Sequence, residues 1–115
     1  MSDDLFNTIY NKSLDLLSRR EHSFKEIKEK LSARFENKKI IESVIEKLGD
    51  NNLVNNTRYA EAYVSARKRK GFGPKKIAFE LSSKGVDESV TNSVIIEEGD
   101  WESAAKLAFS KKFKD

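Results

Sequence analysis

The sequence predicts an all-α protein built from tandem three-helix repeats. Apolar residues recur at helical spacing, while the alternation typical of strands persists nowhere in the chain. The single proline, Pro74, falls where a helix is expected to begin, the position that tolerates proline best. In addition, the chain matches itself when it is shifted by 50 residues, which is the signature of a repeat architecture.

The internal match has no gaps. A set of first-half residues falls on identical residues in the second half: Arg19, Lys25, Ile27, Leu31, Ser32, Ser43, Val44, Ile45, Gly49 and Asp50 fall on Arg69, Lys75, Ile77, Leu81, Ser82, Ser93, Val94, Ile95, Gly99 and Asp100. We therefore expect repeat 1 over residues 1–52 and repeat 2 over residues 53–99. Residues 100–115 are expected to form the first helix of an incomplete third repeat, capped by Asp100 and running from Trp101 to about Lys112.

Repeat 1 shows three helical segments. The first covers about residues 3–18, with Leu5, Phe6, Ile9, Leu14 and Leu17 on one side. Ser23 and Glu26 have the spacing of a capping box, which predicts the start of a second helix. Asn37 is the expected cap of a third helix, with an apolar stripe at Ile40, Ile41, Val44, Ile45 and Leu48. We expect Gly49 to end that helix in the left-handed conformation.

Repeat 2 follows the same plan with different end signals. Asn55 or Asn56 is expected to cap its first helix, and Gly73-Pro74 to open its second. Gly85 is expected to end the second helix and Asp87 to cap the third. The predicted core positions are Tyr59, Tyr63, Val64, Ile77, Leu81, Val90, Val94 and Ile95.

The composition excludes several chemistries. The chain has 115 residues and no cysteine, so it cannot form disulfides, thiolate metal sites or thiol nucleophiles. It has one histidine, which excludes a metal site made of several histidines within one chain. No apolar run reaches membrane-spanning length, and residues 1–10 lack the pattern of a secretory signal. These features predict a soluble, cytoplasmic protein with no membrane contact.

The densest charge feature is a basic strip at the end of the first helix of repeat 2 and the start of the second. It consists of Arg67, Lys68, Arg69 and Lys70, followed by Lys75 and Lys76. Cations in a last turn complement the helix dipole, whereas cations at a helix start oppose it and need another reason to be there. We expect the strip to contact phosphates or an acidic protein surface, and a purely solvated surface is the alternative.

Other candidate residues allow two interpretations each. Arg19 and Arg20 either extend the basic strip or pair with neighbouring carboxylates such as Glu21 and Glu26. Phe72 is a candidate for base stacking, but burial in the repeat junction is the stronger interpretation. His22 is expected to support the turn at Ser23, since general-base catalysis needs a positioned partner. No enzyme motif, catalytic residue, metal site or cofactor site is predicted.

Two stretches resemble the RecX family, regulators of the bacterial RecA recombinase. They are LLSRREHSFKEIKEKLSARF at residues 16–35 and LVNNTRYAEAYVSARKRKGFGPKKIAFELSSKGVDESV at residues 53–90. The first is similar to the family's Arg-Arg-Glu-His-Ser segment. The second is similar to its Arg-Phe-Ala, Gly-Pro-x-x-Ile and Glu-Leu-x-x-Lys-Gly-Ile segments. The chain departs from the family at Asn55-Asn56, usually acidic, at Tyr59, usually phenylalanine, and in its incomplete third repeat.

The resemblance implies an elongated, curved helical array that lies in the groove of the RecA–DNA filament. It implies inhibition of ATP hydrolysis, strand exchange and filament growth, in homologous recombination, DNA repair and the SOS response, without catalysis by the regulator. The implied partners are the RecA filament, single-stranded DNA within it and, more weakly, free DNA. A monomer is expected. The alternative function is a stand-alone, sequence-nonspecific DNA-binding helical module.

Overall fold

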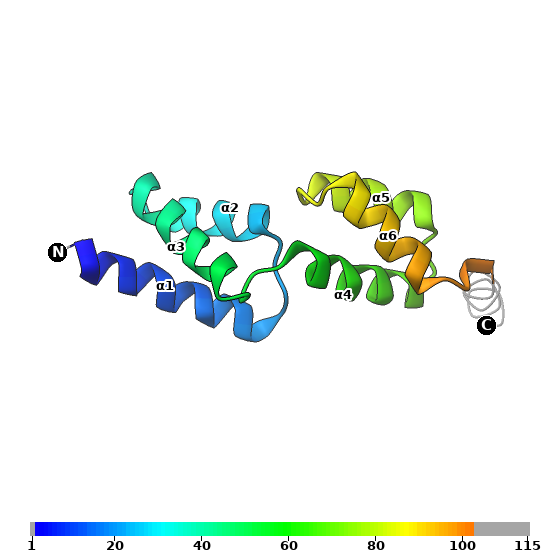
Figure 1. Cartoon of the computed structure of the whole chain (residues 1–115), viewed down its shortest axis with the longest axis horizontal. Coiled ribbons are helices and arrows are strands. Elements are labelled where there is room, and N and C mark those ends of the chain that lie inside the picture. The colour runs from blue at the N-terminus through cyan, green and yellow to red at the C-terminus, as the bar shows by residue number, and fades with distance from the viewer. Residues whose placement is uncertain (1, 103–115) are drawn as a thin grey trace. The chain divides into compact units, whose positions relative to one another are not determined.

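The computed structural model describes residues 2–102, and every regular element among them is a helix (Figure 1). The helices are α1 (Ser2–Arg19), α2 (Phe24–Arg34), α3 (Lys38–Asp50), α4 (Asn56–Arg69), α5 (Pro74–Ser83) and α6 (Glu88–Glu98). The all-α prediction is confirmed. The helix predicted from Trp101 to Lys112 falls, beyond Glu102, outside the described residues.

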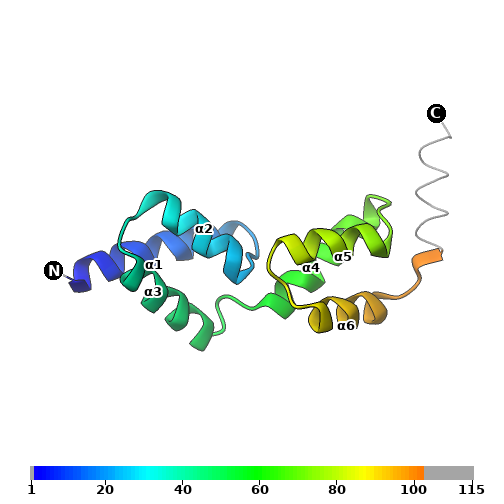
Figure 2. The same cartoon turned by 90° about the horizontal axis from the view of Figure 1, so that it is seen from above.

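The chain divides into two compact units, the first extending through Tyr59 and the second beginning at Ala60. The division therefore falls within α4, near its start. In the first unit α3 packs against both α1 and α2, and in the second unit α5 packs against α6 (Figure 2). The repeat boundaries at residues 52 and 99 remain a prediction.

The core of the first unit is aliphatic. Its buried members are Ile9, Ile27, Leu31, Ile41, Val44, Leu48 and Val54. Ile27 and Leu31 lie four residues apart on α2, so one face of this short helix is buried while the opposite face stays in water. Burial of one stripe per helix is what the 3.6-residue periodicity predicts.

The second unit repeats this arrangement at the equivalent positions. Ile77 and Leu81 on α5 are fully buried, as are Ala60 and Val64 on α4. Val86 and Val94 complete the buried set with exposed fractions of 5% and 4%. The predicted core stripe of repeat 2 is thus confirmed at its central positions.

The predicted helix starts agree with the structure, but the predicted cap at Asp87 is wrong because its side chain makes no capping bond. The capping box forms, with the Ser23 Oγ accepting from the Glu26 N–H and the Glu26 carboxylate accepting from the Ser23 N–H, both at 3.1 Å. Asn37 caps α3 through the Ile40 N–H. Gly73 and Pro74 open α5. Asp87 stands at the start of α6 without a side-chain capping bond.

Asn55, just before α4, and Asn56, its first residue, each accept a hydrogen bond at a helix start. Asn55 Oδ1 accepts from the Arg58 N–H at 3.0 Å and so caps α4 itself. Asn56 Oδ1 accepts from the Phe24 N–H at 2.9 Å, which is the first free donor of α2. Asparagine amide oxygens therefore accept hydrogen bonds at the two positions where the sequence departs from the acidic residues of the family that it resembles.

The predicted role of Gly49 is wrong. The helix α3 continues through Gly49 to Asp50, and Asn52 takes the left-handed conformation with φ of 56°. Gly49 instead permits close packing, because a Cβ atom there would lie 3.1 Å from the Phe24 ring and the ring would have to shift. Gly99, the equivalent residue of repeat 2, does end its helix with φ of +57°.

Candidate functional site

The corner between α4 and α5 contains the predicted basic strip. The helix α4 ends at Arg69, and Gly71 adopts φ of 93°, which reverses the chain direction at little steric cost only for glycine. The Phe72 N–H then donates to the Arg67 carbonyl at 3.2 Å and satisfies one free acceptor of the helix end. Lys70 therefore lies in the turn that follows α4.

Arg67 is engaged within its own unit. Its Nε and Nη2 donate to the two carboxylate oxygens of Glu80 at 3.0 and 2.8 Å, and the Tyr63 hydroxyl donates to Glu80 at 2.9 Å. The hydrogen bonds with Glu80 raise the pKa of Arg67, and the same bonds lower the pKa of Glu80. Arg67 thus holds α4 to α5, and its charge is already matched by a carboxylate.

Lys68 is also engaged within its unit. Its Nζ donates to the Gly99 carbonyl, lies 3.8 Å from a Glu98 carboxylate oxygen and lies 5.4 Å from the Trp101 ring centroid. The Lys68 side chain is only 14% exposed. A lysine near the last carbonyls of a helix complements the negative end of its dipole, so Lys68 serves the end of α6.

Phe72 carries two cations over its ring. The Arg67 guanidinium carbon lies 3.8 Å from the ring centroid, and Lys76 Nζ lies 4.8 Å from it. Cations are attracted to the negative face of an aromatic ring. Phe72 is half-buried, and its ring packs against these cations within the corner between α4 and α5.

The remaining residues of the strip form what we call the cationic corner: Arg69, Lys70, Lys75 and Lys76, all exposed. Within residues 2–102, the side chains of Arg69, Lys70 and Lys75 make no hydrogen bond or ion pair. Lys75 and Lys76 occupy the first turn of α5, which holds no acidic residue. The cationic corner therefore presents positive charge that the described fold does not neutralise.

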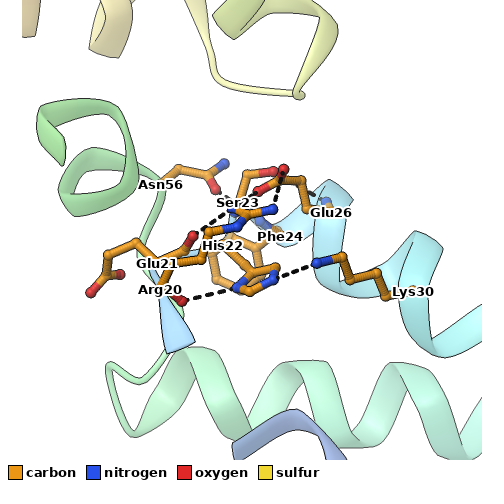
Figure 3. A network of polar contacts seen from close by, with 8 residues as sticks. All are labelled: Arg20, Glu21, His22, Ser23, Phe24, Glu26, Lys30 and Asn56. Atoms are coloured by element: carbon orange, nitrogen blue, oxygen red, sulfur yellow. Dashed lines mark hydrogen bonds and ion pairs between the residues drawn. The ribbon is translucent and has the colours of Figure 1, made fainter. Parts of the chain in front are cut away.

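The corner between α1 and α2 uses its arginines differently (Figure 3). Arg20 donates to both carboxylate oxygens of Glu26 at 3.1 Å and to the Glu21 carbonyl at 2.8 Å. The Glu26 hydrogen bonds raise the pKa of Arg20. Arg19 pairs with Asp15 one turn earlier at 3.2 Å and is largely exposed. The pairing of Arg20 with Glu26 is thus the observed one.

His22 lies inside the corner, 1% exposed (Figure 3). Its Nδ1 lies 3.0 Å from the Arg20 carbonyl and its Nε2 lies 2.8 Å from Lys30 Nζ. A carbonyl can only accept, so Nδ1 carries the proton and Nε2 accepts from the ammonium group. Burial lowers the pKa of His22, as expected for a neutral imidazole in this position. Its contacts are those of a structural residue.

The sequence pattern did not reveal Glu80 or the pair of Glu21 with Arg58. Arg58 Nε donates to Glu21 Oε1 at 2.7 Å, and its two terminal nitrogens donate to the carbonyls of Asn52 and Leu53. Glu80 falls on Lys30 in the 50-residue alignment, a reversal of charge between repeats. That reversal was a usable signal, because a charge that changes sign between repeats indicates a changed partner.

Among residues 2–102 no set of three or more metal-ligating side chains is close enough to hold an ion. The helices of that same part of the chain are too short or too polar to cross a membrane.

The fold and the two corners define a tandem three-helix repeat protein with an exposed cationic surface. Residues 10–48 match the model of the first three-helix domain of RecX, and residues 55–95 match that of the second. The regulatory protein RecX of Pseudomonas fluorescens strain Pf-5 is 33% identical over 111 residues, covering 96% of this chain and 72% of that protein. The chain belongs to the RecX family.

Two further relatives agree. The regulatory protein RecX of Serratia proteamaculans is 33% identical over 132 residues, covering 95% of this chain and 79% of that protein. The crystal structure of RecX from Lactobacillus salivarius superposes with a TM-score of 0.82 at 31% identity, covering 97% of this chain and 73% of that one. The tandem helical fold is therefore shared with a solved member of the family.

Proposed function

We propose that the chain regulates the RecA recombinase, mainly as an inhibitor, by binding in the groove of the RecA–DNA filament. Bound there, it restrains ATP hydrolysis, strand exchange and filament growth in homologous recombination and the SOS response to DNA damage. It acts by binding as a cytoplasmic monomer, without catalysis and without a cofactor. Family membership supports this proposal, since the relatives are named regulatory proteins.

The cationic corner carries the proposal for how the chain contacts the filament. Arg69, Lys70 and Lys75 are exposed and have no anionic partner among the described residues. Lys75 and Lys76 oppose the dipole of α5, a cost of about 0.3–1 kcal/mol per charge that an anionic partner would offset. DNA phosphates in the filament are the favoured partner, and acidic RecA side chains are the alternative.

Arg67 and Lys68 contribute to the proposal through the fold of their unit and not through direct contact with the filament, in contrast to what the basic strip indicated in the sequence. Both are engaged within their unit, Arg67 by Glu80 and Lys68 by Gly99 and Glu98. A binding test that alters them would also disturb the fold. Arg19 and Arg20 likewise have carboxylate partners, so we assign them a secondary role in filament binding.

RecA-dependent ATP hydrolysis on single-stranded DNA tests the proposal. Sub-stoichiometric wild-type chain should inhibit hydrolysis. The variant Arg69→Glu/Lys70→Glu/Lys75→Glu should need at least about tenfold more protein for the same inhibition, because several phosphate contacts become repulsive. The control Lys28→Glu/Lys38→Glu/Lys39→Glu changes the net charge equally at exposed positions of the first unit and should inhibit like wild type.

A folded wild-type chain that leaves RecA hydrolysis unchanged would overturn the proposal. Equal inhibition by the wild type and the cationic-corner variant would show that the cationic corner does not contribute to the inhibition. The same corner also supports the alternative, a sequence-nonspecific DNA-binding module, because phosphate contacts carry no sequence information. Binding to single-stranded DNA that is equally tight with and without RecA would favour that alternative.

A further inference from the structure

A groove on the second unit lies between α5 and α6, and Phe79 of its lining lies one helical turn after Lys75 of the cationic corner. It has a volume of about 260 Å³ and is lined by Phe79 and Ala78 of α5, by Val86, and by Glu88 and Thr91 of α6, among others. The Phe79 side chain is 77% exposed although it is large and apolar. Such a side chain beside a concave surface is the usual mark of a contact site.

Comparison of the two repeats shows that the helical fold does not require Phe79. It falls on Glu29 in the 50-residue alignment, so the first unit places an exposed charge where the second has an exposed aromatic ring. The same three-helix arrangement thus forms with either kind of side chain. The apolar character of the groove belongs to the second unit alone.

Thr91, which also lines the groove, is polar at a position where repeat 1 has an apolar residue. It falls on Ile41, a core residue that is 1% exposed, and is itself 3% exposed. Its Oγ1 has no hydrogen-bond partner among the described residues. A buried hydroxyl without a partner is destabilising, and because this oxygen is itself enclosed, it is not presented to the groove.

We propose that this groove receives an apolar side chain of a protein partner that also carries a neighbouring cationic group. Phe79, Ala78 and Val86 supply the apolar contact. Glu88, the charged residue of the lining, pairs with the cation. A carboxylate at this position repels nucleic acid phosphates, which favours protein over DNA as the occupant.

The size of the groove agrees with one or two side chains. Its volume lies below the range of about 300–1,000 Å³ that is typical of pockets for small molecules. This inference rests on the proposed function: the partner is then a RecA subunit of the filament. The groove would hold RecA while the cationic corner holds phosphate, so the two surfaces divide protein contact from DNA contact.

Equilibrium binding of the full chain to RecA filaments on single-stranded DNA, and to the same DNA alone, tests the inference. The variant Phe79→Glu introduces the residue of repeat 1 and should bind filaments at least about tenfold more weakly, as expected for loss of an aromatic anchor. Its affinity for DNA alone should be unchanged. Its thermal melt should match wild type because Phe79 is exposed.

Ile96→Glu provides the matched control. Ile96 is 76% exposed on the same unit, does not line the groove and falls on Glu46 of repeat 1. It should bind filaments like wild type.

Each other outcome overturns the inference. If Phe79→Glu binds filaments with wild-type affinity, the groove is not a binding site for the filament, and the proposed function still stands. An equal loss of affinity for DNA alone identifies a base-stacking site, and a loss of self-association in sedimentation identifies a second copy as occupant. If the wild-type chain itself does not bind filaments, the proposed function and the inference fall together.

Discussion

The Arg67 guanidinium and the Glu80 carboxylate form a bidentate ion pair, with N–O distances of 3.0 and 2.8 Å, that holds the last turn of α4 to α5. The same guanidinium lies over the Phe72 ring, so the corner has a polar and an aromatic contact on one side chain. Both contacts depend on the planar geometry of arginine. Arg67 is therefore an anchor of the second unit, although it begins the strip that the sequence marks as basic.

Arg67→Lys should lower the melting temperature of the second unit while leaving helical content at low temperature unchanged. An ammonium group keeps the charge but cannot donate in parallel to both Glu80 oxygens while stacking on Phe72. Circular dichroism during thermal unfolding measures the effect. Arg69→Lys is the control, and equal melting temperatures for the two variants would refute the anchoring role.

Stability of the first unit should depend on pH through His22. Burial lowers the pKa of His22 below its ordinary 6.5, so the folded state favours the neutral ring. The stabilisation is present above about pH 6.5 and is lost as the pH falls toward the lowered pKa, by at most about 1.4 kcal/mol per pH unit. Of the neighbouring charges, Arg20 and Lys30 lower this pKa and Glu26 raises it.

Denaturant unfolding of the wild type and of His22→Phe between pH 5 and 7.5 measures this dependence. Phenylalanine is the residue that repeat 2 places at the equivalent position, Phe72. The difference in unfolding free energy between the two proteins should change with pH. A constant difference would show that His22 has the same pKa in the folded and unfolded chain.

Ile77→Asp should unfold the second unit. Ile77 is fully buried, and an unpaired carboxylate there costs several kcal/mol, on the order of the whole stability of a domain of about 5–15 kcal/mol. Amide NMR spectra should lose the dispersed signals of α5 and α6. Exposed Ser82→Asp on the same helix should keep them. A native spectrum for Ile77→Asp would contradict the assigned core.

Gly85→Ala should destabilise the end of α5 by about 1–2 kcal/mol, because a side chain is disfavoured in the left-handed conformation. Gly85 has φ of 80°, as the sequence pattern predicted for a residue that ends this helix. The free energy of unfolding in urea measures the cost. Gly73→Ala is a suitable control, because a Cβ atom at Gly73 meets no atom within 4 Å.

Binding of the chain to single-stranded DNA should weaken with salt. Each phosphate neutralised by a cation contributes about 0.7 to the slope of log affinity against log salt concentration. The variant Arg69→Glu/Lys70→Glu/Lys75→Glu should therefore show a shallower slope, whereas the control with changes at Lys28, Lys38 and Lys39 should keep it. Equal slopes for all proteins would place the DNA contact elsewhere.

The sequence predicted those features that depend on neighbours along the chain. The capping box of Ser23 and Glu26, the cap at Asn37 and the turn at Gly85 need only a few adjacent residues, and all three are present. The apolar stripes were predictable for the same reason, since helical periodicity is local. The internal repeat also predicted that the two corners lie at equivalent positions, 50 residues apart in the sequence.

Features that depend on contacts between separate helices were not predicted. The helical role of Gly49 is explained by the Phe24 ring, which lies on another helix. The partner of Arg67 is Glu80, 13 residues away, and no local pattern joins them. The strip therefore looked uniform in the sequence, although Arg67 and Lys68 face inward partners while Arg69, Lys70 and Lys75 remain exposed.

The placement of Glu80 also makes the charge at the corner of the second unit different from that of the first. In the first unit the arginine of the corner bonds to Glu26 in the first turn of α2, so the start of that helix is electrically neutralised. In the second unit the ion pair has moved to Glu80, further along α5, and Lys76 stands at the position equivalent to Glu26. Moving the carboxylate along the helix leaves its first turn positive. The corner of the first unit is thus neutralised within its own fold, whereas that of the second unit keeps the exposed positive charge on which the proposed binding of anions rests.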